Sequence, residues 1–485
     1  MNIDMSKARE IYNEFKDFPL TAIDYELGRD VPGFRDLTKD EKDEIFIELG
    51  EKEEVEERKS IVEEAKIEVK VPRIEEEREE KPHNTIEKDG KVYVELKQPL
   101  SEELMNKYIF IAVRETQDIY VYTKEGYYQN ARVFVEEKAK ELVGEEEITD
   151  YQVSKIITNI RASNYKSEEE LNPPLLLNLK NGVLNLSNRE FYPHSPIYYF
   201  TYQVDVEYNP KAECDKFDKF LSEVIDERDV DSIYEFIGQC LLPDNKYQII
   251  FFLTGGGRNG KGVLVKVMEE FFGKTSCVSA SPTALRLDNN KLLKLRNKKL
   301  WIAPEVVIDK RDGELVKRIT GGDTLSGRAA YKLELEEFVF YGNVVMQSNE
   351  PLKPYEDTVA AYSRFKIINF PITFDGIDGN PEPDRNLREK LITPNELSGI
   401  LNKALNGVER LRKNKDYSSK QTHEDIKRII EMSKDPLEYF INERYILVPN
   451  EEVERNEVFI EFDLWRKKNQ LTFWSDKKLA SELQR

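Results

Sequence analysis

Cysteine and histidine are scarce in this chain of 485 residues, with only three of each. The cysteines are far apart, and neither a CxxC pair nor a Cys/His spacing typical of a zinc site occurs. These features argue against a zinc site and against a disulfide framework, and they favour reduced thiols. The three cysteines are Cys214, Cys240 and Cys277.

Long apolar runs are also missing, and so is an excess of positive charge. No stretch is long enough to span a bilayer, and the N-terminus lacks the apolar core of a signal peptide, so we expect a cytoplasmic protein without a membrane partner. Lys and Arg number 73 against 93 Asp and Glu, which gives a net charge of −20. This balance excludes a simple basic DNA-coating protein, although a locally basic channel would remain compatible with it.

Composition and pattern divide the chain into five segments. Residues 1–95 are typical of a short helical piece and a charged linker, and 96–245 of an α+β accessory domain that could serve oligomerisation. Residues 246–375 have the pattern of an α/β domain, 376–434 that of a helical lid or connector, and 435–485 that of a partial winged helix. The charged linker favours a plain spacer over a mobile arm that recruits a partner, because nothing in it carries chemistry.

Turn residues and periodicity predict the local elements. Two hairpins are expected, one from Ile119–Tyr122 to Gly126–Tyr128 and one across the Asn181-Gly182 turn. Five apolar runs are expected to form interior strands of a mostly parallel sheet, at 249–253, 300–303, 337–341, 344–347 and 365–370. Helices are expected at 133–142, 151–160, 215–242, 263–272, 387–412, 423–432, 436–444 and 453–468, with a last one capped by Ser475.

The strongest motif, Gly-Gly-Gly-Arg-Asn-Gly-Lys at residues 255–261, matches GxxxxGK between a strand and a helix. Glycines there let backbone N–H groups wrap phosphates, and Lys261 would bridge the β- and γ-phosphates. The alternative, a glycine-rich turn with an unrelated lysine, is disfavoured by the flanking strand and helix. We expect nucleotide binding by Gly255, Gly256, Gly257, Arg258, Asn259, Gly260, Lys261, Gly262 and Val263.

The residue after the lysine departs from this pattern. Gly262 stands where Ser or Thr normally offers a hydroxyl to Mg²⁺, so the metal would depend on an acidic residue, water and the phosphates. Glu305, at the end of the strand 300–303, is the candidate for holding Mg²⁺ and polarising the attacking water. The alternative, a surface glutamate after a strand, is disfavoured by the order of these features along the chain.

Three further features carry weight only in combination. Asn349 ends an apolar strand and could orient the attacking water, and Arg364 is a candidate arginine finger, although an ordinary ion-paired arginine is the plainer interpretation. The run 317–332 combines Gly-Gly-Asp with spaced cations, which is typical of a solvated loop or hairpin.

In this order the segments resemble the ATPase part of phage, plasmid and poxvirus primase–helicases within superfamily 3. The resemblance covers about 110–412 and rests on the residues at 181–186, 236–243, 259–261, 317–328, 349 and 398–402. It implies an AAA+ P-loop core, ATP and Mg²⁺ as ligands, and a homo-oligomeric ring, expected to be a hexamer, with ATP sites between subunits. It implies catalytic roles for Lys261, Glu305, Asn349 and Arg364, although Ser363 stands where the family often has a second arginine.

The resemblance also implies contact with single-stranded and forked DNA through a channel hairpin, carried here onto Lys317, Arg328 and Lys332. The first 95 residues lack the acidic and His signature of the family's primase domain, so we expect a separate primase or origin-binding protein as partner. The expected function is ATP-driven unwinding in the replication of a virus, plasmid or integrated element, in the host-cell cytoplasm. Double-stranded DNA translocation without unwinding, or an ATP-assembled origin-binding scaffold, are the alternatives.

Overall fold

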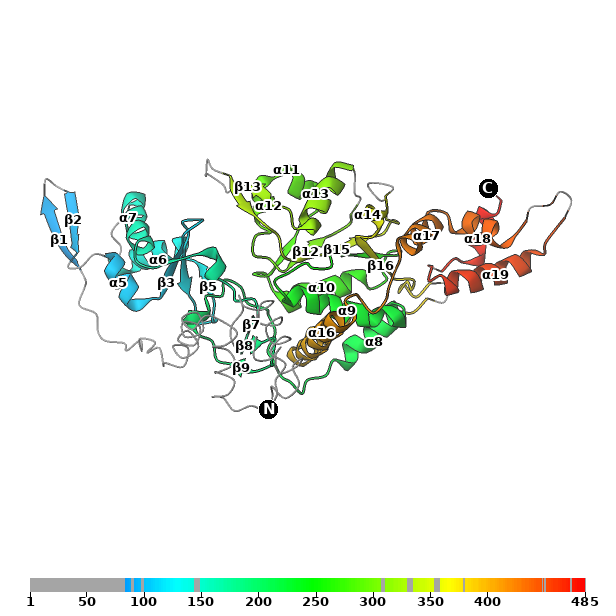
Figure 1. Cartoon of the computed structure of the whole chain (residues 1–485), viewed down its shortest axis with the longest axis horizontal. Coiled ribbons are helices and arrows are strands. Elements are labelled where there is room, and N and C mark those ends of the chain that lie inside the picture. The colour runs from blue at the N-terminus through cyan, green and yellow to red at the C-terminus, as the bar shows by residue number, and fades with distance from the viewer. Residues whose placement is uncertain are drawn as a thin grey trace, which may run out of the picture. The chain divides into compact units, whose positions relative to one another are not determined.

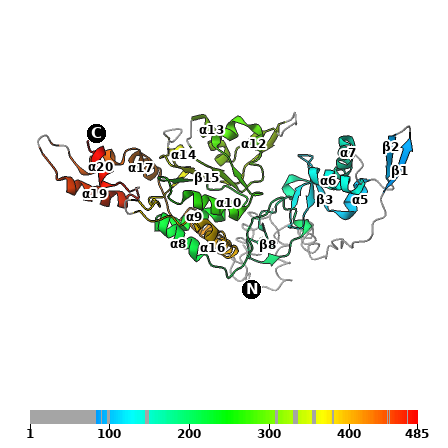
Figure 2. The same ribbon diagram turned by 180° about the vertical axis from the view of Figure 1, so that it is seen from behind.

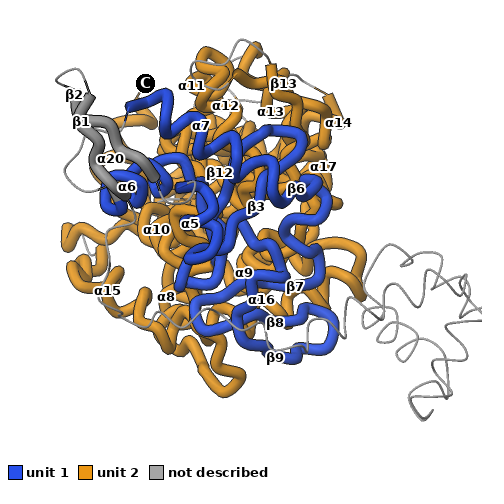
Figure 3. Tube along the Cα trace, turned by 90° about the vertical axis from the view of Figure 1, so that its left-hand side faces the viewer, with its two compact units in different colours: residues 1–203 blue, residues 204–485 orange. Residues whose placement is uncertain are grey.

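The computed structural model describes residues 83–88, 91–96, 100–143, 149–306, 310–328, 335–352, 358–377, 380–446, 448, 451–471 and 473–484. It divides into two compact units, residues 1–203 and residues 204–485 (Figure 3). The division falls before the boundary expected at 245, because the two helices that follow Val204 pack within the second unit.

The expected helical piece and charged linker lie outside the described residues as far as residue 82. Within the last part of that segment, β1 (His83–Lys88) pairs with β2 (Lys91–Leu96) as an antiparallel hairpin. This hairpin was not predicted, although Asp89-Gly90, a favoured two-residue turn, stands between the two strands in the sequence.

In the first unit, helices cover one face of a four-stranded sheet of order β5-β4-β3-β6. Both expected hairpins are present: Tyr122 pairs with Tyr128, and Leu179 with Gly182. The elements are α5 (Leu100–Lys107), β3 (Phe110–Val113), β4 (Ile119–Tyr122), β5 (Tyr128–Asn130), α6 (Arg132–Val143), α7 (Asp150–Arg161), β6 (Tyr165–Lys166), β7 (Leu176–Leu179), β8 (Gly182–Asn185) and β9 (Phe191–Tyr192).

The second unit is built on a five-stranded parallel sheet of order β11-β12-β15-β10-β16. The strands are β10 (Ile250–Thr254), β11 (Cys277–Ser279), β12 (Leu300–Ala303), β15 (Asn343–Ser348) and β16 (Phe365–Asn369). Four of the expected runs form these strands, and β11 was missed because it is only three residues long and partly exposed.

The expected interior strand at 337–341 is wrong. Its place is taken by β14 (Glu336–Phe338), which pairs antiparallel with β13 (Leu325–Gly327) in a separate two-stranded hairpin. Apolar residues here pack from the hairpin onto the side of the core, which gave the run the appearance of an interior strand.

Helices cover both faces of the parallel sheet (Figure 1, Figure 2). Ile250 and Phe252 of β10 face a cluster with α11, α12 and α13, whereas Phe251 stacks on Phe236 of α9, on the opposite face, with ring centroids 4.2 Å apart. A strand buried on both faces explains its unbroken apolar sequence. The helices are α8 (Asp215–Val224), α9 (Glu227–Leu241), α10 (Lys261–Phe272), α11 (Pro282–Leu287), α12 (Asn289–Leu293), α13 (Lys310–Gly321) and α14 (Val359–Tyr362).

The helical stretch expected at 215–242 is two helices, because Asp226 caps the N-terminus of α9 by accepting from Arg228 N–H. The stretch expected at 387–412 is also two helices, α15 (Leu387–Leu391) and α16 (Pro394–Asn414). Thr393 caps the second and Pro394 occupies its first position, which is typical of a helix start.

The C-terminal segment adds a small helical cluster beside β16, the edge strand of the sheet. Its described part contains α17 (His423–Lys434), α18 (Pro436–Arg444), α19 (Arg455–Lys468) and α20 (Asp476–Glu482), the last capped by Ser475 as expected. Gln421 blocks the edge strand, since its side-chain amide exchanges two hydrogen bonds with the backbone of Ile367. No helix in the described ranges is both long and apolar enough to cross a membrane.

Helices α9 and α16 approach each other closely through glycines. A Cβ added at Gly238 would lie 2.3 Å from Ala404 O, so Gly238→Ala should force the helices apart. We expect the free energy of unfolding to fall by roughly 1–3 kcal/mol, as for other overpacked cores. Gly321→Ala is the control, because its added Cβ would meet its nearest neighbour, Asp323 Oδ1, at an ordinary 3.7 Å. Denaturant titrations of both variants measure the difference, and equal midpoints would contradict the packing argument.

Candidate active site

The phosphate loop leaves β10 at Thr254 and enters α10 at Lys261. Gly255 has a φ of 145°, and a Cβ there would lie 2.4 Å from Phe370 O, so only glycine fits. Gly260, at the N-cap of α10, has a φ of 94°. The first N–H groups of a helix have no carbonyl partner within the helix, so the start of α10 beside this loop favours an anion.

Lys261 is 5% exposed, and its ammonium is held within the loop. Its Nζ donates to Gly255 O at 2.8 Å, to Gly256 O at 2.9 Å and to Asn259 Oδ1 at 3.0 Å. Burial lowers the pKa of Lys261 from 10.5 to about 8, because an ammonium is less well solvated inside the protein than in water.

Glu305 and Asn349 meet the phosphate loop at one cavity of about 430 Å³. Glu305 follows β12 and Asn349 follows β15, and both strands run parallel to β10 in the same sheet. The carboxyl ends of parallel strands lie on the same side of a sheet. This brings together Lys261, Glu305 and Asn349, which are separated by up to 88 positions in the sequence. The lining residues are Gly257, Arg258, Asn259, Gly260, Lys261, Gly262, Val263, Glu305, Gln347, Ser348 and Asn349.

Two residues of this cavity have strained backbone. Arg258 has a φ of 56° and Glu305 a φ of 46°, in the left-handed region that non-glycine residues rarely occupy. The hydrogen bond from Val306 N–H to Gln347 O fixes the chain directly after Glu305. Such strain gathers at functional sites, and nothing in the sequence indicates it.

The donor set at this cavity suits a metal that arrives with a nucleotide. Glu305 is the single carboxylate among the described residues that line it, and no cluster of three His, Cys, Asp or Glu side chains occurs in the described ranges. Mg²⁺ is commonly held by one or two carboxylates together with phosphates and waters. Glu305 therefore fits that mode, whereas a cage made of protein ligands alone does not.

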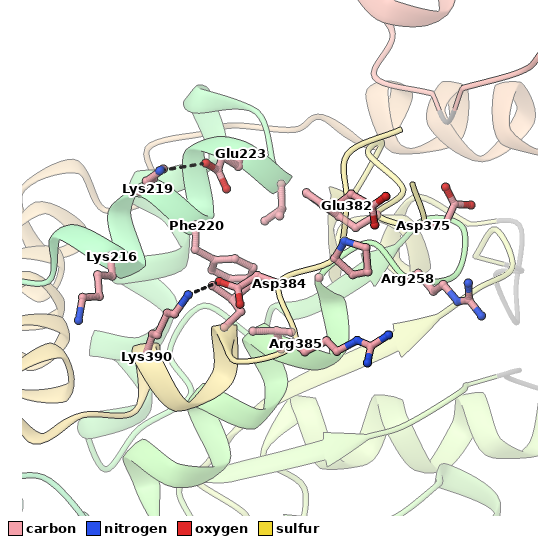
Figure 4. A pocket seen from close by; sticks show the side chains of 16 residues that line it. Lys216, Lys219, Phe220, Glu223, Arg258, Asp375, Glu382, Asp384, Arg385 and Lys390 are labelled. Carbon is pink, nitrogen blue, oxygen red and sulfur yellow. Dashed lines mark hydrogen bonds and ion pairs between the residues drawn. The ribbon is translucent and has the colours of Figure 1, made fainter. Parts of the chain in front are cut away.

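A second cavity, of about 880 Å³, adjoins the first and shares Arg258, Gly260 and Val263 with it. Phe220 of α8 lies at its centre in Figure 4, while Asp384 pairs with Lys390 along one side. The volume is in the range of nucleotide-sized ligands. Sequence reasoning missed this cavity because α8 and the connector 374–387 are distant from the motif and carry no signal of their own.

Arg364 lies at the amino-terminal ends of the parallel strands, whereas the phosphate loop lies at their carboxyl ends. Arg364 O accepts from Ile250 N–H at 2.7 Å, which places it before the first residue of β16, whereas the loop follows the last residue of β10. Five residues of strand separate these ends by roughly 16 Å. Its Nη1 donates to Ala360 O at 2.7 Å, and its buried Nε has no hydrogen-bond partner in the described part of the chain.

The residues expected to contact DNA are distributed over two elements. Lys317 is exposed on α13, and Arg328 is exposed directly after β13, where the segment that joins β13 to β14 begins. Lys332 lies outside the described residues.

Two family models match parts of this chain, and curated proteins are also similar to it. The model "D5 N terminal like" matches residues 86–226, and that of a family of unknown function (DUF5906) matches 253–364. A putative helicase, 121R of Invertebrate iridescent virus 3, is 26% identical over 332 residues, which cover 60% of this chain and 35% of the viral protein. Together these matches support a phage- or virus-type primase–helicase family for this chain.

The match to the viral protein spans about a third of that protein's own length. Two solved structures of the NrS-1 C-terminal region without ligand are also similar. One covers 78% of this chain and 87% of its own, with a TM-score of 0.46 and 15% identity. The other covers 76% and 85%, with a TM-score of 0.45 and 13% identity.

Gly262 leaves room for the hydroxyl that Ser or Thr would supply at this position. A Cβ added there would meet nothing within 4 Å, so Gly262→Ser should fold normally. If the site hydrolyses ATP with Mg²⁺, as the resemblance implies, the serine variant should need several-fold less Mg²⁺ for half-maximal hydrolysis, because its hydroxyl adds a metal ligand. Gly262→Ala is the matched control, with the same backbone effect and no hydroxyl. Identical Mg²⁺ dependence in the two variants would contradict the expectation.

Proposed function

We propose that this chain is an ATP-hydrolysing DNA helicase of superfamily 3 that works as a hexameric ring in the replication of a virus or other mobile element. The observation that carries the proposal is the 430 Å³ cavity, where the phosphate loop, Glu305 and Asn349 converge. These three parts suffice to hold a triphosphate, polarise a water and orient it.

In this proposal each side chain has one task. Lys261 neutralises charge on the β- and γ-phosphates, Glu305 accepts the proton of the attacking water, and Asn349 orients that water. Mg²⁺, when bound, would add electrostatic stabilisation of the phosphates near Glu305. The adjoining 880 Å³ cavity, with Phe220 as an apolar wall, has the size and position to receive the nucleoside.

The strand order supports an AAA+ core. β15 lies between β10, which leads into the phosphate loop, and β12, which leads to Glu305. Arg364 supports a shared site, because about 16 Å of strand keeps it from its own phosphate loop and leaves a neighbouring subunit's site as its target.

DNA contact is proposed for the β13–β14 hairpin. Arg328 directly follows β13, where the segment that joins the two strands begins, and Lys317 lies on the preceding helix α13. Cations presented locally suit a phosphate backbone even in a chain with a net charge of −20. Single-stranded and forked DNA are the proposed substrates, and a separate primase or origin-binding protein is a proposed partner.

Complementation between two inactive variants tests the shared site. Lys261→Ala removes the phosphate ligand and Arg364→Ala removes the finger, and each alone should lower ATP hydrolysis on the order of 10³-fold. Mixed rings should recover activity, because a Lys261→Ala subunit still offers Arg364 to an intact neighbouring phosphate loop. Arg388→Ala, which breaks a surface ion pair with Glu270, is the control and should hydrolyse normally. Absence of recovery in mixtures that form rings would rule out a finger acting between subunits.

Strand displacement separates the helicase from its alternatives. On forked DNA with a labelled strand, we expect ATP-dependent release of that strand by the native chain and none by Lys261→Ala. Hydrolysis stimulated by duplex DNA without release would point to a double-stranded DNA translocase. Nucleotide-dependent assembly with no hydrolysis would point to a scaffold.

A further inference from the structure

Asn259 belongs to the phosphate loop, yet its side chain turns into the protein, and the residue is only 3% exposed. Its amide oxygen accepts a hydrogen bond from Lys261 Nζ at 3.0 Å, and its amide nitrogen donates to Phe370 O at 3.1 Å. One buried amide therefore joins the ammonium of the phosphate-binding lysine to the main chain directly after β16.

Each end of the strand β16 adjoins a residue that matters to the proposed function. Phe370, just beyond its last residue, donates its N–H to Thr254 O at 2.8 Å, beside the phosphate loop. Arg364 directly precedes its first residue. Since β16 is paired in register with β10 along its five residues, its two ends are coupled by a short, rigid element.

We propose that Asn259 is a positioning residue with two ties. The first holds the Lys261 ammonium in place for the phosphates. The second fixes the end of β16, so that the nucleotide state of one subunit is transmitted to the Arg364 that the same subunit offers to its neighbour. The second tie rests on the proposed function of Arg364, whereas the first does not.

The hydrogen bonds of Lys261 explain how the ties would work together. Its ammonium has three donors, and in the free protein these contact Gly255 O, Gly256 O and Asn259 Oδ1. Binding phosphate oxygens requires release of at least one of them. Asn259 supplies the single side-chain acceptor of the three, and it can rotate where the backbone carbonyls cannot. Its rotation also breaks the hydrogen bond to Phe370 O, which leaves the end of β16 held at this point by the bond from Phe370 N–H to Thr254 O.

The charge state of Lys261 gives this role a measurable signature. Burial lowers the pKa of Lys261 to about 8, and the other charged groups among the described residues lining the cavity are Arg258 and Glu305. The charged ammonium binds phosphate, so nucleotide affinity should fall as pH rises through about 8, approaching tenfold per pH unit above it. A carboxylate in contact with the ammonium would raise that pKa by roughly one to three units.

Asn259→Asp is therefore the decisive variant, since it keeps an acceptor for Lys261 and loses the donor to Phe370 O. Affinity for a fluorescent ADP analogue, measured from pH 7 to 10, should fall near pH 8 in the native chain and at least one unit higher in the variant. Asn402→Asp is the matched control, because Asn402 also donates to backbone carbonyls, Asn209 O and Ala212 O, away from the site. An unmoved alkaline fall in Asn259→Asp overturns the first tie.

A second measurement uses no nucleotide, so it remains informative if Asn259→Asp binds the ADP analogue too weakly for a titration. The pH dependence of Lys261 acylation by acetic anhydride, read by mass spectrometry, should shift upward in Asn259→Asp by the same amount and stay unchanged in Asn402→Asp. No shift there also overturns the first tie.

The second tie is tested by cooperativity. The Hill coefficient for ATP hydrolysis should exceed 1 in the native chain and in Asn402→Asp, and fall to about 1 in Asn259→Asp. A coefficient that Asn259→Asp leaves unchanged overturns the second tie. If mixed Lys261→Ala and Arg364→Ala rings fail to recover activity, the proposed finger fails instead, and the pH measurements still decide the role of Asn259 at its own lysine.

Discussion

The parallel register of β10, β12 and β15 is the constraint on which the rest of the structure depends. Because the three strands run in one direction side by side, their carboxyl ends deliver the phosphate loop, Glu305 and Asn349 to the same side of the sheet. The helices on both faces keep the strands buried and in register. A shift of one strand by a residue would turn its apolar side chains to the wrong face, so the site's geometry is protected by the core.

The same sheet holds the two parts of the proposed mechanism, phosphate binding and the arginine finger, apart from each other. The phosphate loop, Glu305 and Asn349 lie at the carboxyl ends of the strands, and Arg364 lies at the opposite end, where β16 begins. If the phosphate loop binds a triphosphate as proposed, the Arg364 of the same subunit is held too far away to reach it. If Arg364 acts as proposed, activity depends on assembly, and β16 is the shortest mechanical path between one site and the next.

Much of the fold was predictable, because local patterns encode local hydrogen bonds. The unbroken apolar run of β10, the caps at Thr393 and Ser475, and the Asn181-Gly182 turn each determine structure within a few residues. The predicted helices and strands were wrong where one local pattern is compatible with two structures. The stretch 215–242 suits one helix until Asp226 caps a second, and the run at 337–341 suits an interior strand or a hairpin beside the core.

By itself, the sequence determined the glycine-rich loop between β10 and α10 and most of the strands and helices, and it predicted roles for Glu305, Asn349 and Arg364. Only the tertiary structure decided which strand ends are neighbours, that Arg364 lies at the strand ends away from the loop, and that Phe220 walls a second cavity. It also decided that Asn259 faces inward, toward Phe370. The physical reason is range: propensities and caps act within a turn or two, whereas strand order, strained φ angles and buried amide contacts come from packing segments that are a hundred residues apart.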